Sequence, residues 1–120
     1  MSQDLDVSQE KVKSFVVKLV KIQDVRSFVE KWHYSGNVNG LRISHVFGLY
    51  FGENLIGAMI YGGMAMANAW KKYASSDSKI VELRRLCCID KTPRNTESYF
   101  IGKTLRWLAK NTNYDMVISY

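Results

Sequence analysis

Residues 82 to 110 read ELRRLCCIDKTPRNTESYFIGKTLRWLAK, so a polar turn joins an apolar strand to an amphipathic helix. Lys91 and Arg94 carry positive charge just before the helix begins. The first turn of any helix adds backbone N–H groups without partners and a partial positive charge. Together these features predict a turn that can hold a phosphate group.

The same turn also suits a plain connection between a strand and a helix. In that interpretation Asn95 or Thr96, with Glu97, caps the helix and Arg94 is solvated. The residues of the turn alone do not decide between the two.

A histidine and a tyrosine form the second candidate site. His33 and Tyr34 stand near the end of a predicted helix, before the loop sequence GNVNG. A histidine moves a proton near neutral pH, and a neighbouring phenol can donate or accept one. The alternative is structural: His33 caps the C-terminus of its helix, and Tyr34 packs against the sheet.

Positive charge is in excess, since 17 Lys and Arg face 11 Asp and Glu for a net charge of +6. Such a balance is compatible with nucleic acid, a phosphorylated cofactor or solubility alone. Phosphate contacts would give salt-dependent affinity without reading the base sequence. The basic residues gather in the middle and at the end of the chain: Lys71, Lys72, Arg84, Arg85, Lys91, Arg94, Lys103 and Arg106.

Two of these lysines lie in a segment of undecided structure, residues 64 to 79, between Trp70 and Tyr73. An aromatic and basic loop could stack on an extruded base. Alternatively, Lys71 and Lys72 are solvated and Trp70 is anchored in the core. Of Arg84 and Arg85, adjacent on a strand, we expect one to pair with Glu82.

The elements that must position these residues follow from periodicity and turn signals. Residues 14 to 22 are rich in β-branched residues and predict a strand, and two apolar runs around GEN at 52 to 54 predict a hairpin over 43 to 63. Further strands are predicted at 80 to 89, with Val81, Leu83 and Arg85 on one face, and at 114 to 120.

Two amphipathic helices complete the prediction. The first begins after Asp24 as N-cap and stops at Gly36, with Val25, Phe28, Val29 and Trp32 at helical spacing. The second follows Pro93, with an apolar stripe of Ile101, Leu105 and Leu108 joined by Phe100, Thr104 and Trp107, and with Lys103, Arg106 and Lys110 outside.

The order strand, helix, hairpin, strand, helix, strand predicts a mixed sheet of the α/β or α+β class. The two strands that bracket the second helix should be parallel neighbours. Residues 1 to 12 are predicted to be a loose polar leader, and 13 to 120 a single domain.

Other features of the chain exclude several classes of protein. No run approaches the roughly 20 apolar residues of a membrane span, and the polar N-terminus differs from a signal peptide, which predicts a cytoplasmic protein without a membrane partner. Cys87 and Cys88 are adjacent, point to opposite faces of a strand and should be free thiols. No pattern of metal ligands is evident.

Four stretches resemble the phage Mom family of DNA adenine-modification proteins, which has a GNAT-related acyltransferase fold. They are WHYSG (32 to 36), FGLYFGENLIGAMIYGG (47 to 63), residues 81 to 110 and ISY (118 to 120). The third stretch is the most specific, because the strand, Asp90, Pro93, NTES and the helix follow in fixed order. The resemblance covers roughly residues 14 to 120.

The resemblance implies a central mixed sheet with flanking helices and an activity that adds a carbamoylmethyl group to N6 of adenine in double-stranded DNA. This modification shields phage DNA from host restriction, so the protein would act in the host cytoplasm. His33 and Tyr34 match the family's HYS and would handle the proton of the exocyclic amine. Ser98, the serine of NTES, would orient substrate or lie unused on the helix.

The general fold further implies an acyl-coenzyme A-like donor, whose pyrophosphate would be held by Arg94, Asn95, Thr96 and Glu97. The glycine-rich version of that turn is absent here. Basic residues between 64 and 94, among them Lys71, Lys72, Arg84, Arg85 and Lys91, would hold the DNA backbone.

The last strand of the family usually continues as SYAD with an acidic active-site residue, whereas this sequence ends at Tyr120. We therefore expect the closing strands to be missing and residues 114 to 120 to leave an edge open to a second copy or partner chain. Two rival functions remain: an N-acyltransferase for a small molecule or protein, and a non-catalytic shortened module that binds DNA or protein.

Overall fold

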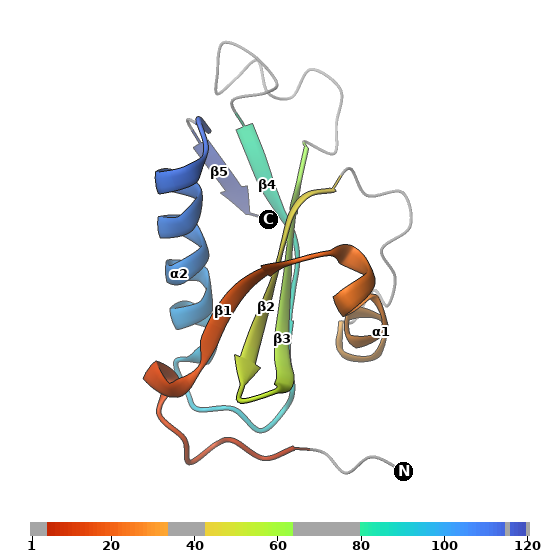
Figure 1. The fold of residues 1–120 in the computed structure, drawn as a ribbon, viewed down its shortest axis with the longest axis vertical. Helices are drawn as coiled ribbons and strands as arrows, with labels where there is room; N and C mark the ends of the chain where they lie inside the picture. The colour runs from red at the N-terminus through yellow and green to blue at the C-terminus, as the bar shows by residue number, and fades with distance from the viewer. Residues whose placement is uncertain (1–4, 34–42, 64–79, 115, 120) are drawn as a thin grey trace.

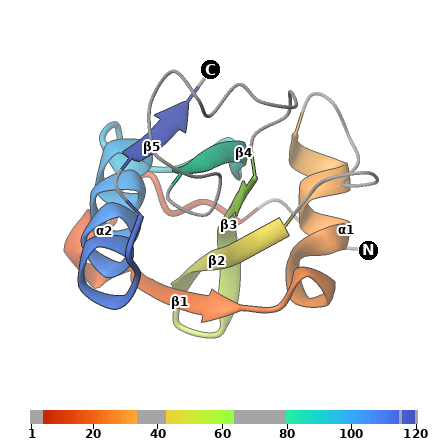
Figure 2. The ribbon, with the colours of Figure 1, turned by 90° about the horizontal axis from the view of Figure 1, so that it is seen from above.

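The computed structural model describes residues 5–33, 43–63, 80–114 and 116–119. A five-stranded sheet in the order β1-β2-β3-β4-β5 separates α1 on one face from α2 on the other (Figure 1; Figure 2). Along the chain the elements are η1 (Val12–Ser14), β1 (Val16–Val20), α1 (Ile22–Trp32), β2 (Ile43–Phe51), β3 (Asn54–Gly62), β4 (Ile80–Cys88), α2 (Thr96–Asn111) and β5 (Met116–Ser119).

Strands β1 to β4 pair antiparallel with their neighbours, and β5 pairs parallel with β4 after the α2 crossover. The predicted element order, the hairpin and the mixed α/β class are thus confirmed. Gly52 opens the hairpin turn with φ of +61°, a left-handed conformation that glycine adopts without steric cost.

The central strand β3 supplies both halves of the core. Its residues from Ile56 to Gly62 are all buried. Met59 and Tyr61 pack on the α2 face, whereas Ala58 and Ile60 pack on the α1 face. This alternation is the two-residue period of a strand covered on both sides.

Helix α2 packs through an i, i+4 stripe. Thr96, Phe100, Thr104 and Leu108 are buried, and Thr104 shares a 2.8 Å hydrogen bond with the Tyr61 hydroxyl. The predicted stripe is wrong at Leu105, whose side chain is 38% exposed. The periodicity of the sequence fits either stripe, and the sheet selects the one that also buries two threonines.

Gly57 permits the close approach of α2 to the sheet. A Cβ atom there would meet Cys88 Sγ at 3.0 Å, Leu49 Cβ at 3.2 Å and Phe100 Cε2 at 3.3 Å. Because three neighbours crowd the position, any side chain at residue 57 would push the first turns of α2 outward.

The start of α1 differs from the prediction. Lys21, and not Asp24, is the N-cap residue, and Asp24 stands three residues into the helix. The Lys21 N–H donates to Asp24 Oδ2 at 3.0 Å, and the Asp24 N–H donates to the Lys21 carbonyl at 2.9 Å. Asp24 therefore caps the helix from within, as the acidic partner of a capping box does. The helix ends at Trp32; the predicted stop at Gly36 lies outside the described residues.

The prediction that residues 1 to 12 form a loose leader is wrong for the second half of this segment. Val7 is 1% exposed within the α2-side core, and its N–H donates to the Lys91 carbonyl at 2.9 Å. A single apolar residue in a polar stretch gives no periodic signal, so the sequence did not reveal this contact.

Strand β4 contains a register shift that changes the predicted faces. Leu83 pairs with Tyr61 and Arg85 with Ile60, so Arg84 has no partner of its own on β3. Arg85 consequently lies on the α1 face with Ile60, and not with Val81 and Leu83 as predicted. The expected ion pair with Glu82 is confirmed for Arg84, at 3.8 Å.

Cys87 and Cys88 are free and pack on opposite faces, as predicted. Among the residues with described positions, no helix has the length and apolar character needed to cross a membrane.

Substitutions of two leucines of α2 test the observed stripe. We expect Leu108→Ala to lower the free energy of unfolding by about 2 to 5 kcal/mol, because it leaves a cavity in the core. Leu105→Ala should cost about 0.5 kcal/mol or less, as exposed positions do. Urea unfolding followed by circular dichroism measures both. Equal losses of unfolding free energy in the two variants would show that Leu105 is buried, as the sequence predicted.

Candidate functional site

The turn between β4 and α2 is built around Pro93. The Pro93 carbonyl accepts hydrogen bonds from Thr96 Oγ1 at 2.7 Å and from the Thr96 N–H at 3.2 Å. Asn95 occupies the N-cap position, but its side chain makes no capping hydrogen bond. Thr96 therefore closes the turn, and the side chain of Asn95 leaves the N–H groups of the first helical turn uncapped.

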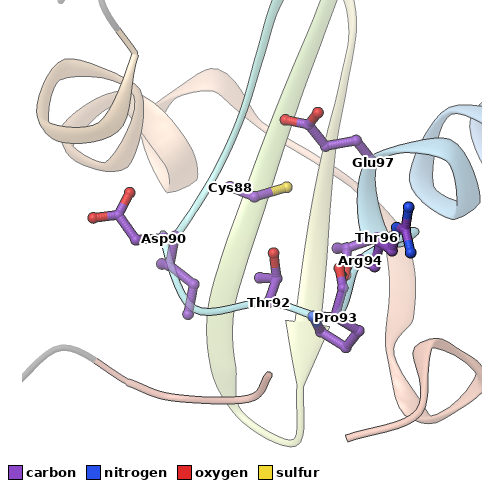
Figure 3. A pocket seen from close by; sticks show the side chains of 8 residues that line it. Cys88, Asp90, Thr92, Pro93, Arg94, Thr96 and Glu97 are labelled. Carbon is purple, nitrogen blue, oxygen red and sulfur yellow. The ribbon is translucent and has the colours of Figure 1, made fainter. Parts of the chain in front are cut away.

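A cavity of about 320 Å³ lies at this turn. Figure 3 shows Cys88 and Glu97 at one end of it, and Pro93, Arg94 and Thr96 at the other. Its lining also includes Ile89, Asp90 and Thr92. The predicted phosphate turn thus borders a real cavity, and three of its four predicted cofactor residues line it: Arg94, Thr96 and Glu97. The fourth, Asn95, adjoins the cavity in sequence and is exposed.

The charges around the cavity are mixed. Asp90 and Glu97 supply two carboxylates, and Arg94 supplies one guanidinium. Burial, followed by the nearby charge of Glu97, raises the pKa of the Cys88 thiol to about 12. The Cys88 thiol is therefore protonated at neutral pH, and the two carboxylates flank the cavity, with Asp90 just after β4 and Glu97 in the first turn of α2 near Arg94.

His33 lies on the other face of the sheet, at the C-cap of α1. Its backbone N–H donates to the Val29 carbonyl at 2.9 Å, which confirms that His33 caps the C-terminus of the helix. The pKa of the imidazole is lowered, first by burial and then by the positive charge of Arg85. The side chain is half-buried and favours the neutral form at pH 7.

Only some of the predicted site residues come together. Arg94, Thr96 and Glu97 meet at the cavity on the α2 side, and His33 and Arg85 meet on the α1 side. Ser98 is exposed on α2 and does not line the cavity. The predicted residues Tyr34, Lys71 and Lys72 lie outside the described residues.

The remaining predicted DNA contacts differ in their surroundings. Arg84 is held inside the sheet, where Nη1 donates to the Gly63 carbonyl at 3.2 Å. The Arg85 guanidinium donates to the Arg84 carbonyl at 2.8 Å. Lys91 is exposed at the β4–α2 turn. Hydrogen bonds from Ser8 lower the pKa of Asp6, and the charge of Lys91 adds to this effect. Of these three residues, Lys91 is the one most free to reach a DNA phosphate.

Two features of the site were missed from the sequence. Cys88 and Asp90 line the cavity, although only their places beside the turn could have suggested it. The approach of Arg85 to His33 depends on the register shift in β4, for which the sequence carries no signal. In the described part of the chain, no group of three or more His, Cys, Asp or Glu could hold a metal ion.

Comparison with known structures identifies the fold. An aminoglycoside acetyltransferase from an uncultured soil metagenomic sample, solved in complex with sisomicin, superposes with a TM-score of 0.61 at 8% identity. The match covers 90% of this chain and 78% of that one. This likeness shows that the chain has a GNAT-type acetyltransferase fold.

The family follows from the sequence. The sequence model of the Mom protein family matches residues 14–120, and the chain belongs to this family. The resemblance seen in the motifs is thereby confirmed. No curated protein matches the chain significantly.

The titration of His33 tests the geometry on the α1 side. We expect an NMR titration midpoint below the ordinary histidine value of 6.5, because burial and Arg85 both disfavour the imidazolium. Arg85→Gln should raise this pKa and still leave it below 6.5. Lys31→Gln, which removes an exposed charge two residues away, is the matched control and should change it less.

The pKa of His45, the other histidine, is also lowered by burial. Both histidines therefore bind protons more readily in the unfolded chain, so the free energy of unfolding should fall as the pH drops through 6.5. A titration midpoint of His33 above 6.5 would contradict the effect of burial and Arg85 on this histidine. Equal shifts of the His33 pKa in Arg85→Gln and Lys31→Gln would contradict the specific effect of Arg85.

Proposed function

We propose that this protein is a transferase that adds a carbamoylmethyl group to N6 of adenine in duplex DNA and so protects phage DNA from restriction. One observation carries the proposal: in a chain of the Mom family, the β4–α2 turn borders a cavity of about 320 Å³. That cavity lies where a donor with anionic groups would meet the start of a helix.

An acyl-coenzyme A-like donor fits one end of this cavity. The N–H groups at the start of α2 and the Arg94 guanidinium would hold its phosphates. The Glu97 carboxylate, which also lines the cavity, carries charge of the same sign as a diphosphate and weakens that fit. A bound donor would supply the carbon group that is transferred.

His33 is the residue assigned to proton transfer. Its lowered pKa keeps the imidazole neutral at pH 7, so it could accept the proton that the adenine amine loses as the new N–C bond forms and the bond between the transferred carbon and its donor breaks. Arg85 supports this state because its charge disfavours the imidazolium. Tyr34 remains the proposed partner of His33, and Ser98 a proposed substrate contact.

The proposed reaction requires its reactants to reach both faces of the sheet, because the cavity borders the β4–α2 turn and His33 ends α1 on the other face.

An N-acyltransferase acting on a small molecule or a protein is the second candidate, and the fold likeness to an aminoglycoside acetyltransferase favours it. It requires the same donor site and no DNA. Consumption of an acyl-coenzyme A donor without any change to DNA would identify this function.

Nucleoside mass spectrometry tests the main proposal. Plasmid DNA from cells that express the chain should contain a deoxyadenosine heavier by one carbamoylmethyl group, and His33→Ala should abolish it. Lys31→Ala, an exposed change on the same helix, is the control that should retain it. Unmodified DNA with a folded, soluble protein would refute the enzyme assignment and leave a DNA- or protein-binding module.

Two substitutions in the cavity test the binding of the donor, and they should change its affinity in opposite directions. Arg94→Gln should weaken the binding of coenzyme A by about tenfold or more, because a charged hydrogen bond is lost. Glu97→Gln should strengthen it, because a like charge is removed. Isothermal titration calorimetry measures both affinities. Weaker binding by Glu97→Gln would show that this carboxylate accepts a hydrogen bond from the donor.

A further inference from the structure

Helix α2 carries three exposed cations along one flank, which we name the basic ridge: Lys103, Arg106 and Lys110. The ridge lies on the side of α2 that faces β1, because Tyr99 on the same flank donates from its hydroxyl to the Phe15 carbonyl at 3.4 Å. Lys103 Nζ lies 5.5 Å from the centre of the Tyr99 ring. The tyrosine thus fixes one end of the ridge to the sheet.

Folding alone does not favour the basic ridge. Lys103 and Arg106 are three residues apart and Arg106 and Lys110 are four apart, so like charges face each other along the helix, which is destabilising. Residues 98 to 111 contain no Asp or Glu to offset them. Within the described structure, none of the three cations forms an ion pair with a carboxylate.

The ridge continues beyond α2. Residues 11 to 14 contain two lysines and no acidic residue. They include η1, which lies beside the start of α2 in both views (Figure 1; Figure 2). Lys11 and Lys13 are exposed there. Positive charge therefore extends from the side of α2 onto the neighbouring segment.

Gly102 supplies an independent observation on the same helix. Glycine in the middle of a helix is less stable than alanine, and the packing of the described residues does not require it here. Among those residues, a Cβ at residue 102 would meet only the Arg106 guanidinium, at 3.7 and 3.9 Å. The small residue instead leaves the helix backbone beside Arg106 open to close approach from outside.

We infer that the basic ridge binds the phosphate backbone of duplex DNA. The inference rests on the proposed function for its partner and assigns that partner to a surface outside the β4–α2 cavity. Lys103 and Lys110 are separated by about 10 Å along the helix, which matches about three base-pair steps of a DNA strand. Such contacts position the duplex without reading its sequence.

The salt dependence of DNA binding tests the inference. The affinity of the full chain for a short DNA duplex is measured by fluorescence anisotropy over a range of salt concentrations. In the triple variant Lys103→Gln, Arg106→Gln, Lys110→Gln the slope of log affinity against log salt should fall by about 2 to 3, because each lost phosphate contact removes about 0.9. Circular dichroism checks that the variant is folded.

The matched control is Lys18→Gln, Lys21→Gln, Arg26→Gln, which removes three exposed cations from β1 and α1 and leaves the same net charge. Its slope should remain close to that of the parent chain. Equal losses in both triple variants would overturn the basic ridge, because binding would then depend on net charge alone.

Parallel measurement of modified nucleosides separates this inference from the proposed function. If the parent chain modifies DNA and the ridge variant keeps the full salt slope, the ridge is wrong and the enzyme assignment stands. If the ridge variant loses the salt slope and the parent chain forms no modified nucleoside, the ridge stands and the enzyme assignment is wrong. Failure of the parent chain to bind DNA would refute the ridge directly.

Discussion

The register shift in β4 is the feature on which the two halves of the site depend. Before it, Val81 and Leu83 point to α2; after it, Leu86 and Cys88 do so, although an uninterrupted strand would turn them to the other face. The residue inserted at the shift is Arg84, whose guanidinium contacts Glu82 and the Gly63 carbonyl. Without the shift, Arg85 would enter the α2-side core, and Cys88 would leave the cavity.

The ion pair at the shift explains how the irregularity is tolerated. Glu82 is 4% exposed, and a buried carboxylate is costly unless cations and hydrogen-bond donors surround it. Arg84, which has no partner of its own on β3, supplies the nearby charge. The extra residue therefore supplies a cation to the strand that it interrupts, and this single local irregularity sets the faces of the residues that follow in β4.

Most of the architecture could be predicted from the sequence, because hairpin signals and helical periodicity act locally. The GEN turn, the order of the elements and the cationic side of α2 are examples. The exceptions depend on tertiary contacts. Leu105 satisfies the helical period as well as Leu108 does, and only the position of the sheet decides between them. The sequence around Val7 does not show that its N–H bonds to the distant Lys91 carbonyl. Asp24 fits a helix start either as the N-cap or three residues into the helix, and its reciprocal hydrogen bonds with Lys21 select the second position.

The candidate site was predictable in its parts and not in its arrangement. The β4–α2 turn has a charge and capping pattern that predicts an anion site, and the structure places a cavity of mixed charge at this turn. The order of motifs along the chain, however, does not show on which face of the sheet each residue lies. The family resemblance implies one reaction that uses both His33 and the turn, whereas α1 and α2 place them on opposite faces of the sheet. Any reaction that uses both groups must therefore reach both faces of the sheet.

Helix α2 joins these constraints in one rigid element. Its buried stripe, closed against Gly57 through Phe100, fixes where its first turn meets the cavity. The same packing fixes the direction of its outer flank, so the position of the basic ridge relative to the cavity is set by the core and not by surface residues. A duplex held on the ridge would thus be oriented by the contacts that also shape the cavity. This coupling gives the polar outer residues of α2 a defined geometry even though they are themselves solvent-exposed.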